Sequence, residues 1–282
     1  MKEEWVGISD KDWIKHIDSL KSKGRVSKEE LKKVIVKSIK ERIPKKKFGI
    51  LFSGGVDSSF IALICKQMKA DFICYTIGYG ETARDVEWAK KVAEKLDLNL
   101  KVKELSFDEA KKYIIKTAKL LGEIERPVVH VGVGAVVMAA ADMAKKDKVN
   151  VLLGGLGSEE IFAGYERHQG KGINDECWFG LKRMVEGDLK RDSIIAKAKK
   201  INVLTPFLDK ELIKKAMLVP GSKKMNKEYK KVILREIAEE LGLPKEFAWR
   251  KKKAAQYGSR LDKAIKKLAG KKQKGDYLRG LI

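Results

Sequence analysis

The residues best placed to do chemistry lie in one short segment, Ser53-Gly54-Gly55-Val56-Asp57-Ser58-Ser59. The apolar run 48–52 before it predicts a buried strand, and the apolar residues from Phe60 onward predict a buried helix. A glycine turn at such a junction leaves unpaired N–H groups at a helix N-terminus, where anions bind. Glycine also lets a phosphate approach the backbone closely. The segment therefore predicts a phosphate site, and a glycine turn without a ligand is the plainer alternative.

A second glycine-rich junction, Gly154-Gly155-Leu156-Gly157, follows another apolar run and precedes two adjacent carboxylates, Glu159 and Glu160. Carboxylate oxygens beside a phosphate site suit Mg²⁺, which takes one or two carboxylates together with phosphate oxygens and water. The alternative is that both glutamates only complement a helix dipole. Two such junctions in one chain favour a ligand role for at least one carboxylate.

The elements that must position these residues alternate between strand and helix. Strands are expected at 71–77, 98–105 and 149–153, and helices at 84–96, 107–121 and 131–146. This order predicts an α/β fold with a parallel twisted sheet flanked by helices, and both glycine junctions then lie at the carboxyl ends of strands. No strand is expected after about residue 175, where the remaining chain looks helical.

Residues 8–43 look helical as well, with Ser9 and Ser27 as N-caps and Glu30 completing a capping box with Ser27. Pro44 should end this segment before the first strand. We therefore expect an N-terminal helical appendage over 1–46 and one α/β domain over 47–282.

The composition excludes several classes of protein. Cys65, Cys74 and Cys177 are too scattered for a disulfide framework or a cysteine zinc site, and the three histidines have no metal-ligand spacing. No apolar run looks long enough to span a membrane, and the charged N-terminus lacks the apolar core of a signal peptide. A cytoplasmic location is the expectation.

The net charge of +23 admits two interpretations. One is a partner of opposite charge, either a nucleic acid or simply ATP and pyrophosphate. The other is a surface rich in Lys and Glu, of the kind found in thermophile proteins, which explains the number of charges but not their imbalance. The basic runs are 45–47, 250–253 and 271–272.

Several motifs carry a resemblance to a known family. The pattern Ser-Gly-Gly-x-Asp-Ser resembles the pyrophosphate loop (PP-loop) of the ATP pyrophosphatases, and residues 48–262 resemble the synthetase domain of asparagine synthetases. Besides the loop at 53–59, the matching segments are 127–132, 154–165, 203–209 and 248–253, with Asp85 and Ala89 in the second helix. The resemblance implies an adenine nucleotide alpha hydrolase-like fold and an enzyme that uses ATP and Mg²⁺.

The family's site residues carry over position by position. Asp57 and Glu159 would serve metal and phosphate, and Lys252 would stabilise the charge that develops in the reaction; these three are the expected catalytic residues. The expected pyrophosphate and nucleotide contacts are Phe52, Ser53, Gly54, Gly55, Asp57, Ser58, Ser59, Ile77 and Gly155.

The sequence departs from the family pattern in two respects. It begins Met1-Lys2 without the N-terminal glutaminase domain of the amidating enzymes, so free ammonia, a separate ammonia-supplying subunit or another nucleophile is the expected nitrogen source. Leu156 also replaces the glutamate between the glycines of the second junction. Because leucine can neither accept a proton nor bind an amine, ATP activation is better supported than aspartate as the substrate.

Three functions follow as alternatives. The first is an ATP-dependent carbon–nitrogen ligase that adenylates a small-molecule carboxylate, releases pyrophosphate and transfers the acyl group to a nitrogen nucleophile. The second is an RNA- or tRNA-modifying enzyme that adenylates a base carbonyl. The third is a nucleotide-binding subunit that has lost its chemistry.

Overall fold

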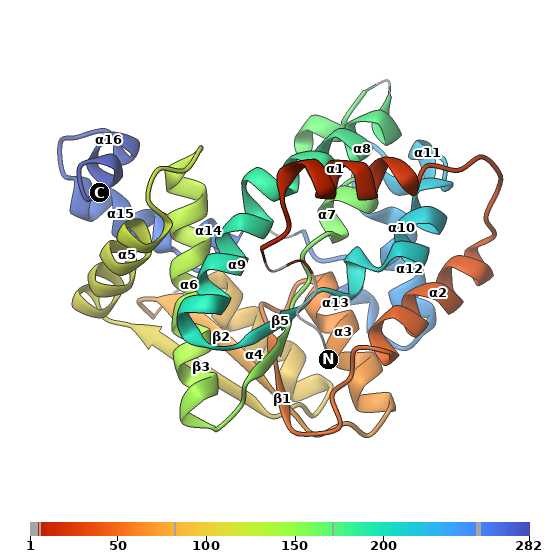
Figure 1. The fold of residues 1–282 in the computed structure, drawn as a ribbon. Coiled ribbons are helices and arrows are strands. Elements are labelled where there is room, and N and C mark those ends of the chain that lie inside the picture. Colours follow the sequence, from red (N-terminus) through yellow and green to blue (C-terminus); the bar gives the residue numbers. More distant parts are fainter. Residues whose placement is uncertain (1–4, 6, 82, 171, 252–254) are drawn as a thin grey trace.

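A computed structural model describes residues 5, 7–81, 83–170, 172–251 and 255–282. At its centre is a five-stranded parallel sheet in the order β3-β2-β1-β4-β5 (Figure 1). The strands are β1 Phe48–Leu51, β2 Phe72–Tyr79, β3 Leu100–Leu105, β4 Val151–Leu153 and β5 Asn202–Leu204. The predicted α/β class with a parallel sheet is confirmed.

Helices cover both faces of the sheet. On one face, α6 packs on β1 and β2 and contacts α5, α9 and α15; on the other, α3 packs on β1, and α4 packs on β2 and β3. The longer helices are α1 Asp10–Ser19, α2 Lys28–Lys40, α3 Val56–Gln67, α4 Arg84–Lys95, α5 Phe107–Leu121, α6 Pro127–Lys146, α8 Ile173–Arg183, α9 Asp188–Lys199, α10 Lys210–Met217, α12 Val232–Glu240 and α15 Leu261–Ala269. The shorter ones are α7 Ser158–Ile161, α11 Gly221–Lys224, α13 Lys245–Ala248, α14 Ala255–Gly258, α16 Lys274–Arg279 and the 3₁₀ turns η1 Glu166–His168, η2 Met184–Glu186 and η3 Pro206–Leu208.

The alternation of side chains along the strands divides the interior into two cores. In β2, Phe72 and Cys74 join the core under α3 and α4, while Ile73, Tyr75 and Ile77 join the core under α6. Both faces are apolar because a parallel sheet carries helices on each side. The sheet is therefore held rigidly between two layers, and its carboxyl edge is a fixed platform.

The N-terminal helices begin where the sequence predicts. The Ser9 side chain accepts a hydrogen bond from the N–H of Asp12, and Ser27 and Glu30 form the expected capping box. Trp13 and Leu31 are fully buried in the same core as β1 and α3. The division at residue 46 remains a prediction, since both helices share this core.

One expectation about apolar runs is wrong. The helix α6 reaches 20 residues with a mean hydropathy of 1.6, which by length and composition is enough to cross a membrane. In this fold 67% of that apolar window is buried, because α6 packs between the sheet and α5, α9 and α15. Its apolar character is accounted for by a place in the core.

The expectation of no strand beyond residue 175 is also wrong. Residues 202–204 form β5, which pairs in parallel with β4 at the edge of the sheet. Three residues, the first of them polar, are too few to show the alternation by which strands are recognised. The strand places Thr205 and η3 next to the second glycine junction.

Candidate functional site

The two glycine junctions lie side by side at the carboxyl edge of the sheet. The first follows β1 and the second follows β4, and these strands are neighbours. The chain adds β2 and β3 on one side of β1 and then returns to place β4 on the other, so the strand order reverses between β1 and β4. Ligands of open α/β sheets bind in the crevice at such a switch point.

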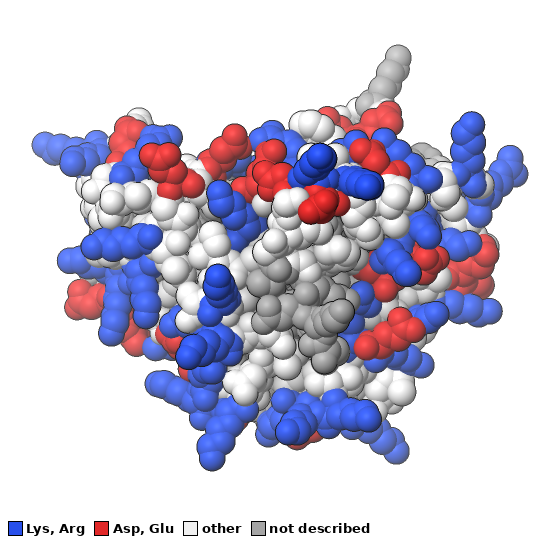
Figure 2. Space-filling model, in the orientation of Figure 1, with Lys and Arg blue, Asp and Glu red and all other residues white. Residues whose placement is uncertain are grey.

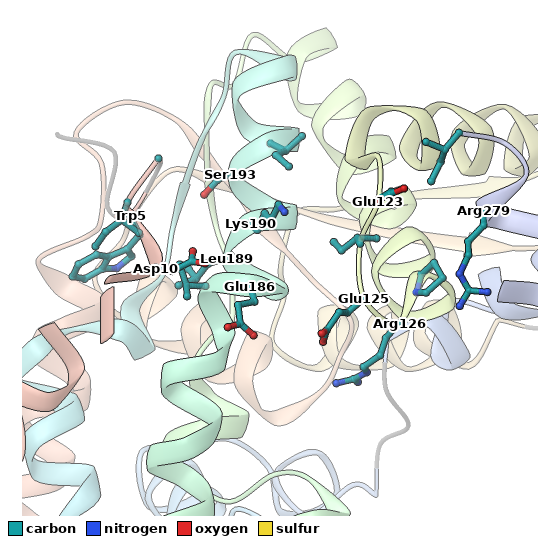
Figure 3. Close-up of a pocket in the computed structure, with 17 residues that line it drawn as sticks. Trp5, Asp10, Glu123, Glu125, Arg126, Glu186, Leu189, Lys190, Ser193 and Arg279 are labelled. Atoms are coloured by element: carbon teal, nitrogen blue, oxygen red, sulfur yellow. The ribbon is translucent and has the colours of Figure 1, made fainter. Parts of the chain in front are cut away.

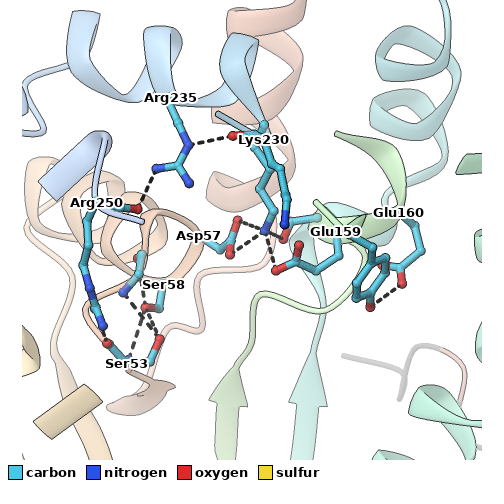
Figure 4. Close-up of polar contacts among 12 residues, drawn as sticks. Ser53, Asp57, Ser58, Glu159, Glu160, Lys230, Arg235 and Arg250 are labelled. Atoms are coloured by element: carbon cyan, nitrogen blue, oxygen red, sulfur yellow. Dashed lines mark hydrogen bonds and ion pairs between the residues drawn. The ribbon is translucent and has the colours of Figure 1, made fainter. Parts of the chain in front are cut away.

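The first junction is shaped by hydroxyl contacts. Ser58 Oγ accepts a hydrogen bond from the N–H of Ser53 at 3.2 Å, and the two hydroxyl oxygens lie 3.3 Å apart (Figure 4). Gly55 is the N-cap of α3 without a side-chain cap, so the N–H groups of the first turn of this helix have no capping side chain. This is the geometry that receives a phosphate group.

Gly54 is required for the packing of α4 against the first junction, which the sequence does not show. Its φ of +61° is left-handed, and a Cβ there would lie 2.8 Å from the backbone of Trp88 and Ala89 in α4. The glycine therefore allows α4 to pack against the loop, rather than only allowing a ligand to approach. Asp85 of the same helix is buried beside it.

Arg250 fastens the first junction to α4. Its guanidinium donates to the carbonyl oxygens of Ser53 at 3.1 Å and Gly54 at 3.0 Å, and to Asp85 Oδ1 at 3.1 Å. Arg235 in turn donates to the carbonyl oxygen of Arg250 at 3.1 Å. The sequence matched Asp85 and the segment 248–253 to the family, but it gave no sign that these two regions brace the loop.

The second junction turns sharply over the first. Gly157 has a φ of +94°, and a Cβ there would lie 2.4 Å from Leu208 Cδ2. A Cβ on Gly155 would lie 3.0 Å from Asp57 Cβ, so this glycine brings the two junctions together. After the turn, α7 presents Glu159 toward Asp57, as Figure 4 shows.

A buried lysine joins the two junctions. Lys231 Nζ lies 2.9 and 2.8 Å from the two carboxylate oxygens of Asp57, 2.7 Å from Glu159 Oε1 and 3.0 Å from Ser158 Oγ. Only 5% of the Lys231 side chain is exposed. Burial alone would lower the pKa of Lys231, but the charges of Asp57 and Glu159 outweigh it and raise the pKa. The ammonium is therefore fixed in its charged form between the loops.

Sequence reasoning did not identify Lys231, although one signal was present. Lys231 is the N-cap of α12 with a φ of +57°, and a cation at a helix N-terminus opposes the helix dipole. A lysine directly before the apolar helix segment Val232-Ile233-Leu234 was thus a cation in an unfavourable place. Ion pairing with Asp57 and Glu159 offsets that cost.

The donor set fits a magnesium ion in part. Asp57 and Glu159 bind the same ammonium group, so their carboxylates are close enough to serve one cation. Among the described residues no group of three His, Cys, Asp or Glu side chains could hold a metal ion by itself. Two carboxylates therefore suit Mg²⁺ only if phosphate oxygens and water complete its six ligands, as is usual for this ion.

A cavity of about 770 Å³ opens over both junctions. Of the residues expected from the sequence, those that line it are Phe52, Ser53, Asp57, Ser58, Ile77, Gly155 and Glu159. Ser59 is fully buried and does not line it, and neither do Gly54 and Gly55. Lys252 lies outside the described residues. The structure thus brings together the first and second junctions and Ile77 of β2.

The part of the cavity beyond the second junction mixes apolar and charged groups. Leu156 lines it, with Val129 and His130 of α6 and Tyr165. The Tyr165 hydroxyl donates to Glu160 Oε1 at 2.9 Å, and burial, with the charge of Asp188 nearby, raises the pKa of Glu160 to about 7. Burial and the charge of Arg191 lower the pKa of His130 to about 4. Leu156 thus gives the cavity wall an apolar surface at the position where the family pattern has a carboxylate.

Figure 3 shows a second cavity, with a volume of about 1090 Å³. It lies between α9 and the turn that leads into α6, and it shares Glu125, Arg126 and Glu186 with the first cavity. Glu125 and Glu186 are both paired with Arg183, at 2.8 and 3.5 Å. These ion pairs stand at the boundary between the two spaces.

Comparison with known proteins supports the sequence resemblance. A profile of the family described as asparagine synthase matches residues 30–175 and 169–279. A Methanocaldococcus jannaschii protein provisionally named a glutamine-hydrolyzing asparagine synthetase is 32% identical over 289 residues, covering 87% of this chain and 52% of that protein. The Escherichia coli asparagine synthetase B is 27% identical over 271 residues, covering 86% of this chain and 46% of that protein. The chain thus spans about half the length of the curated relatives it matches.

Among solved structures, the NMN synthetase of Francisella tularensis is similar with a TM-score of 0.46 and 14% sequence identity. The match covers 91% of this chain and 93% of that one.

Proposed function

The chain belongs to the asparagine synthase family, and from that premise we propose that it is an ATP-dependent ligase that forms an acyl-adenylate. A substrate carboxylate would attack the α-phosphorus of ATP, and the bond to pyrophosphate would break. Ammonia or another nitrogen nucleophile would then attack the acyl carbon, lose a proton and displace AMP. The net result is a carbon–nitrogen bond, AMP and pyrophosphate.

The observation that carries this proposal is the Asp57–Lys231–Glu159 cluster at the switch point of the sheet. Lys231 places a fixed positive charge beside the first turn of α3, where the N–H groups are oriented to receive phosphate. Preorganised charge of this kind stabilises the charge that develops on a departing pyrophosphate. A Mg²⁺ ion bound by Asp57, Glu159 and phosphate oxygens would supply further neutralisation of that charge.

Other residues would hold the loop and the nucleotide. Arg250 restrains the carbonyl groups of Ser53 and Gly54, so that the loop keeps its shape when phosphate binds. Ile77 lines the cavity from β2, which supports the proposal that it would contact the adenosine. Positioning of this sort contributes to displacement at phosphorus by aligning the attacking and leaving oxygens.

Lys252 belongs to the proposal through its match to the family segment. A lysine there would act as a mobile point charge on the leaving group or on the attacked carbonyl. Lys252→Ala should therefore lower turnover by more than it weakens ATP binding, because the charge is needed most in the transition state. Lys251→Ala, a change to an exposed neighbouring lysine, is the matched control.

The acceptor and the nitrogen donor are proposed more broadly. Leu156 favours an acid that does not present an amino group at that position, because burying an amine without a partner costs on the order of several kcal/mol. Free ammonia, ammonia from a separate subunit and an amine are all donors that the proposal admits. A cytoplasmic location is part of the same proposal.

Pyrophosphate–ATP exchange tests the first half of the reaction separately from the second. The protein is incubated with ATP, Mg²⁺, labelled pyrophosphate and a panel of carboxylic acids that includes aspartate, with and without ammonia. We expect label to enter ATP in the presence of one class of acid, and AMP rather than ADP to be released when ammonia is added. Exchange supported by tRNA but by no small acid would favour adenylation of a base carbonyl. Binding of ATP without exchange under any condition would favour a non-catalytic subunit.

A further inference from the structure

The amino edge of the sheet carries a cluster of lysines that the site does not use. Lys45 and Lys46 precede β1, Lys69 precedes β2, Lys146 and Lys148 precede β4, and Lys200 precedes β5. Since the strands are parallel, these approaches meet at one edge, opposite the cavity. We call these six residues the basal patch. Figure 2 shows Lys and Arg side chains gathered along this lower edge.

The six lysines of the patch have no partners among the described residues, and they share one edge of the sheet. All six are exposed, and within the described part of the chain none has an ion pair or a side-chain hydrogen bond. The acids on this edge are already engaged: Asp71 pairs with Lys47 at 3.7 Å, and Asp147 pairs with Lys101. The positive charge of the patch is therefore not neutralised locally.

A contrasting surface lies on α2 and α12. There Lys32 lies 2.6 Å from Glu29 and 3.1 Å from Glu240, while Lys28 pairs with Glu240 and lies 3.7 Å from Glu236. That surface is of the paired Lys/Glu kind. The excess charge of the chain is thus unevenly placed, and the basal patch is one location where it accumulates without acids.

Helix dipoles explain part of the placement. Lys146 is in the last turn of α6, and Lys200 is the C-cap of α9, where a cation interacts favourably with the helix dipole. Lys45, Lys46, Lys69 and Lys148 lie outside any helix. Complementing the dipoles therefore does not account for the whole patch.

We propose that the basal patch binds the phosphate backbone of a nucleic acid. The patch residues precede four adjacent strands, β2, β1, β4 and β5. At the usual spacing between strands, the width of the patch is about 14 Å. A duplex carries one charge per about 1.7 Å of axis, so that length presents about eight phosphates. Lysines without neighbouring aromatic groups contact phosphates and do not distinguish bases. We therefore expect the patch to bind DNA and RNA with similar affinity.

The composition of the patch argues against an acidic protein as the partner. Protein interfaces are depleted in lysine and depend on an apolar centre. Among the described residues the large exposed apolar side chains are Ile14, Met68, Phe179, Tyr257 and Ile282, and of these only Met68 adjoins a patch residue in the chain. A nucleic acid needs no such centre.

The position of the patch also limits its role. It lies at the amino ends of the strands, whereas the cavity over Ser53 and Gly155 lies at their carboxyl ends. A nucleic acid held there would be anchored and would not present a base to the cavity. The patch therefore localises the protein on a polymer, independently of the reaction proposed above.

The test compares two variants of equal charge. The basal variant changes all six patch lysines to glutamine. The control variant changes six exposed lysines that also have no ion pair with any described residue, on or beside α1, α10 and α11: Lys11, Lys15, Lys23, Lys210, Lys223 and Lys227. Figure 1 places α1 and α11 along the top, away from the basal edge.

Anisotropy of a labelled duplex of about 20 base pairs is measured from about 50 to 200 mM salt. For the unmodified protein we expect a slope of log K against log[salt] of about −4 or steeper, similar for DNA and RNA. The basal variant should bring that slope to within about 1 of zero and weaken binding more than tenfold at low salt. The control variant should keep the slope, and changing the six patch lysines to arginine should keep binding.

Three results would overturn the proposal. The first is no binding of the duplex by the unmodified protein at low salt. The second is equal weakening by the basal and control variants, which would mean that only net charge matters. The third is displacement of the duplex by polyglutamate as effectively as by unlabelled duplex, which would favour an acidic protein. Thermal unfolding of both variants verifies that each is folded.

Discussion

Lysines lie at both the carboxyl edge and the amino edge of the central sheet, but their surroundings differ. At the carboxyl end, Lys231 is buried, held by Asp57, Glu159 and Ser158, and reaches its place from a segment far along the chain. At the amino end, the six lysines of the basal patch are exposed and unpartnered within the described residues. One end has a single cation in a fixed position, and the other has many cations with conformational freedom.

The difference reflects what each arrangement can recognise. A buried ammonium between two carboxylates has one geometry, which suits a ligand whose charge must be met at one atom. Exposed lysines keep their hydration and their rotamers, so they suit a long polyanion that has no fixed register. We therefore expect changes at the carboxyl end to alter catalysis steeply and changes at the amino end to leave it untouched.

Removing the buried ammonium should have the largest effect. Lys231→Met leaves the leaving pyrophosphate without its fixed cation, and pyrophosphate–ATP exchange should fall by about 10²–10³-fold. Lys227→Met is the control: Lys227 is an exposed lysine four residues earlier, and it does not line the cavity. Exchange should change less than about threefold in that control. A similar loss in both variants would show that position 231 has no special role.

Removing a carboxylate from the Asp57–Lys231–Glu159 cluster should lower the free energy of unfolding. Asp57→Asn removes one of the two carboxylates facing a buried ammonium, and we expect a loss of about 3 kcal/mol in the free energy of unfolding. The double variant Asp57→Asn/Lys231→Met removes the uncompensated charge as well, and it should recover much of that loss. Urea unfolding measures both. If the double variant is less stable than Asp57→Asn, the two residues do not compensate one another.

Changing Leu156 should alter which carboxylic acid the protein uses more than it alters the rate of ATP cleavage. Leu156→Glu restores a carboxylate between two glycines at the wall of the cavity, so asparagine formation from aspartate and ammonia should improve by about tenfold. Leu156→Gln, which has the size but not the charge of glutamate, should not improve it. Efficient asparagine synthesis by the unmodified protein that is lost on Leu156→Glu would restore aspartate as the natural acceptor.

Lowering the pH should reduce the stability of the folded protein, because His168 is buried and no carboxylate pairs with it among the described residues. Burial and the charge of Arg167 lower the pKa of His168 to about 4, below its ordinary value of 6.5. Between pH 6.5 and pH 4, His168 is therefore protonated in the unfolded chain but remains neutral in the folded protein. The stability that neutral His168 supplies is present above pH 6.5 and declines as the pH falls toward 4, by about 1.4 kcal/mol at pH 5.5.

The comparison of pH profiles uses His168→Asn, since the Asn oxygen can replace His168 Nδ1, which accepts a hydrogen bond from the N–H of Tyr165 at 3.1 Å. This variant should lose less stability than the unmodified protein between pH 7 and pH 5.5. His130, whose pKa is lowered in the same way, should account for a further part of the decline. Identical pH profiles for the variant and the unmodified protein would contradict the assignment.

The sequence was informative where the chemistry is local. Apolar runs and glycines identified β1, β2 and both junctions, because strand, turn and helix start all fall within a few neighbouring residues. It failed for β5, which is too short to show a pattern, and for Lys231, which lies 174 positions from Asp57. Contacts at that separation are set by how helices pack on the sheet, and a single sequence carries no direct sign of them.

Arg250 illustrates the same limit. The sequence offered it as part of a basic run, and a run of charges usually indicates a solvated face. In the fold it is buried and donates to the carbonyl groups of Ser53 and Gly54. Its role depends on the packing of α4 beside the loop, which would be blocked by a Cβ at Gly54.

The most direct measurement is the identity of the nucleotide products. The protein is incubated with ATP, Mg²⁺, ammonia and the panel of acids, and nucleotides and phosphates are separated by anion exchange, with Lys231→Met alongside. We expect AMP and pyrophosphate in equal amounts from the unmodified protein, with little of either from the variant. Formation of ADP and orthophosphate, or AMP production unaffected by Lys231→Met, would contradict it.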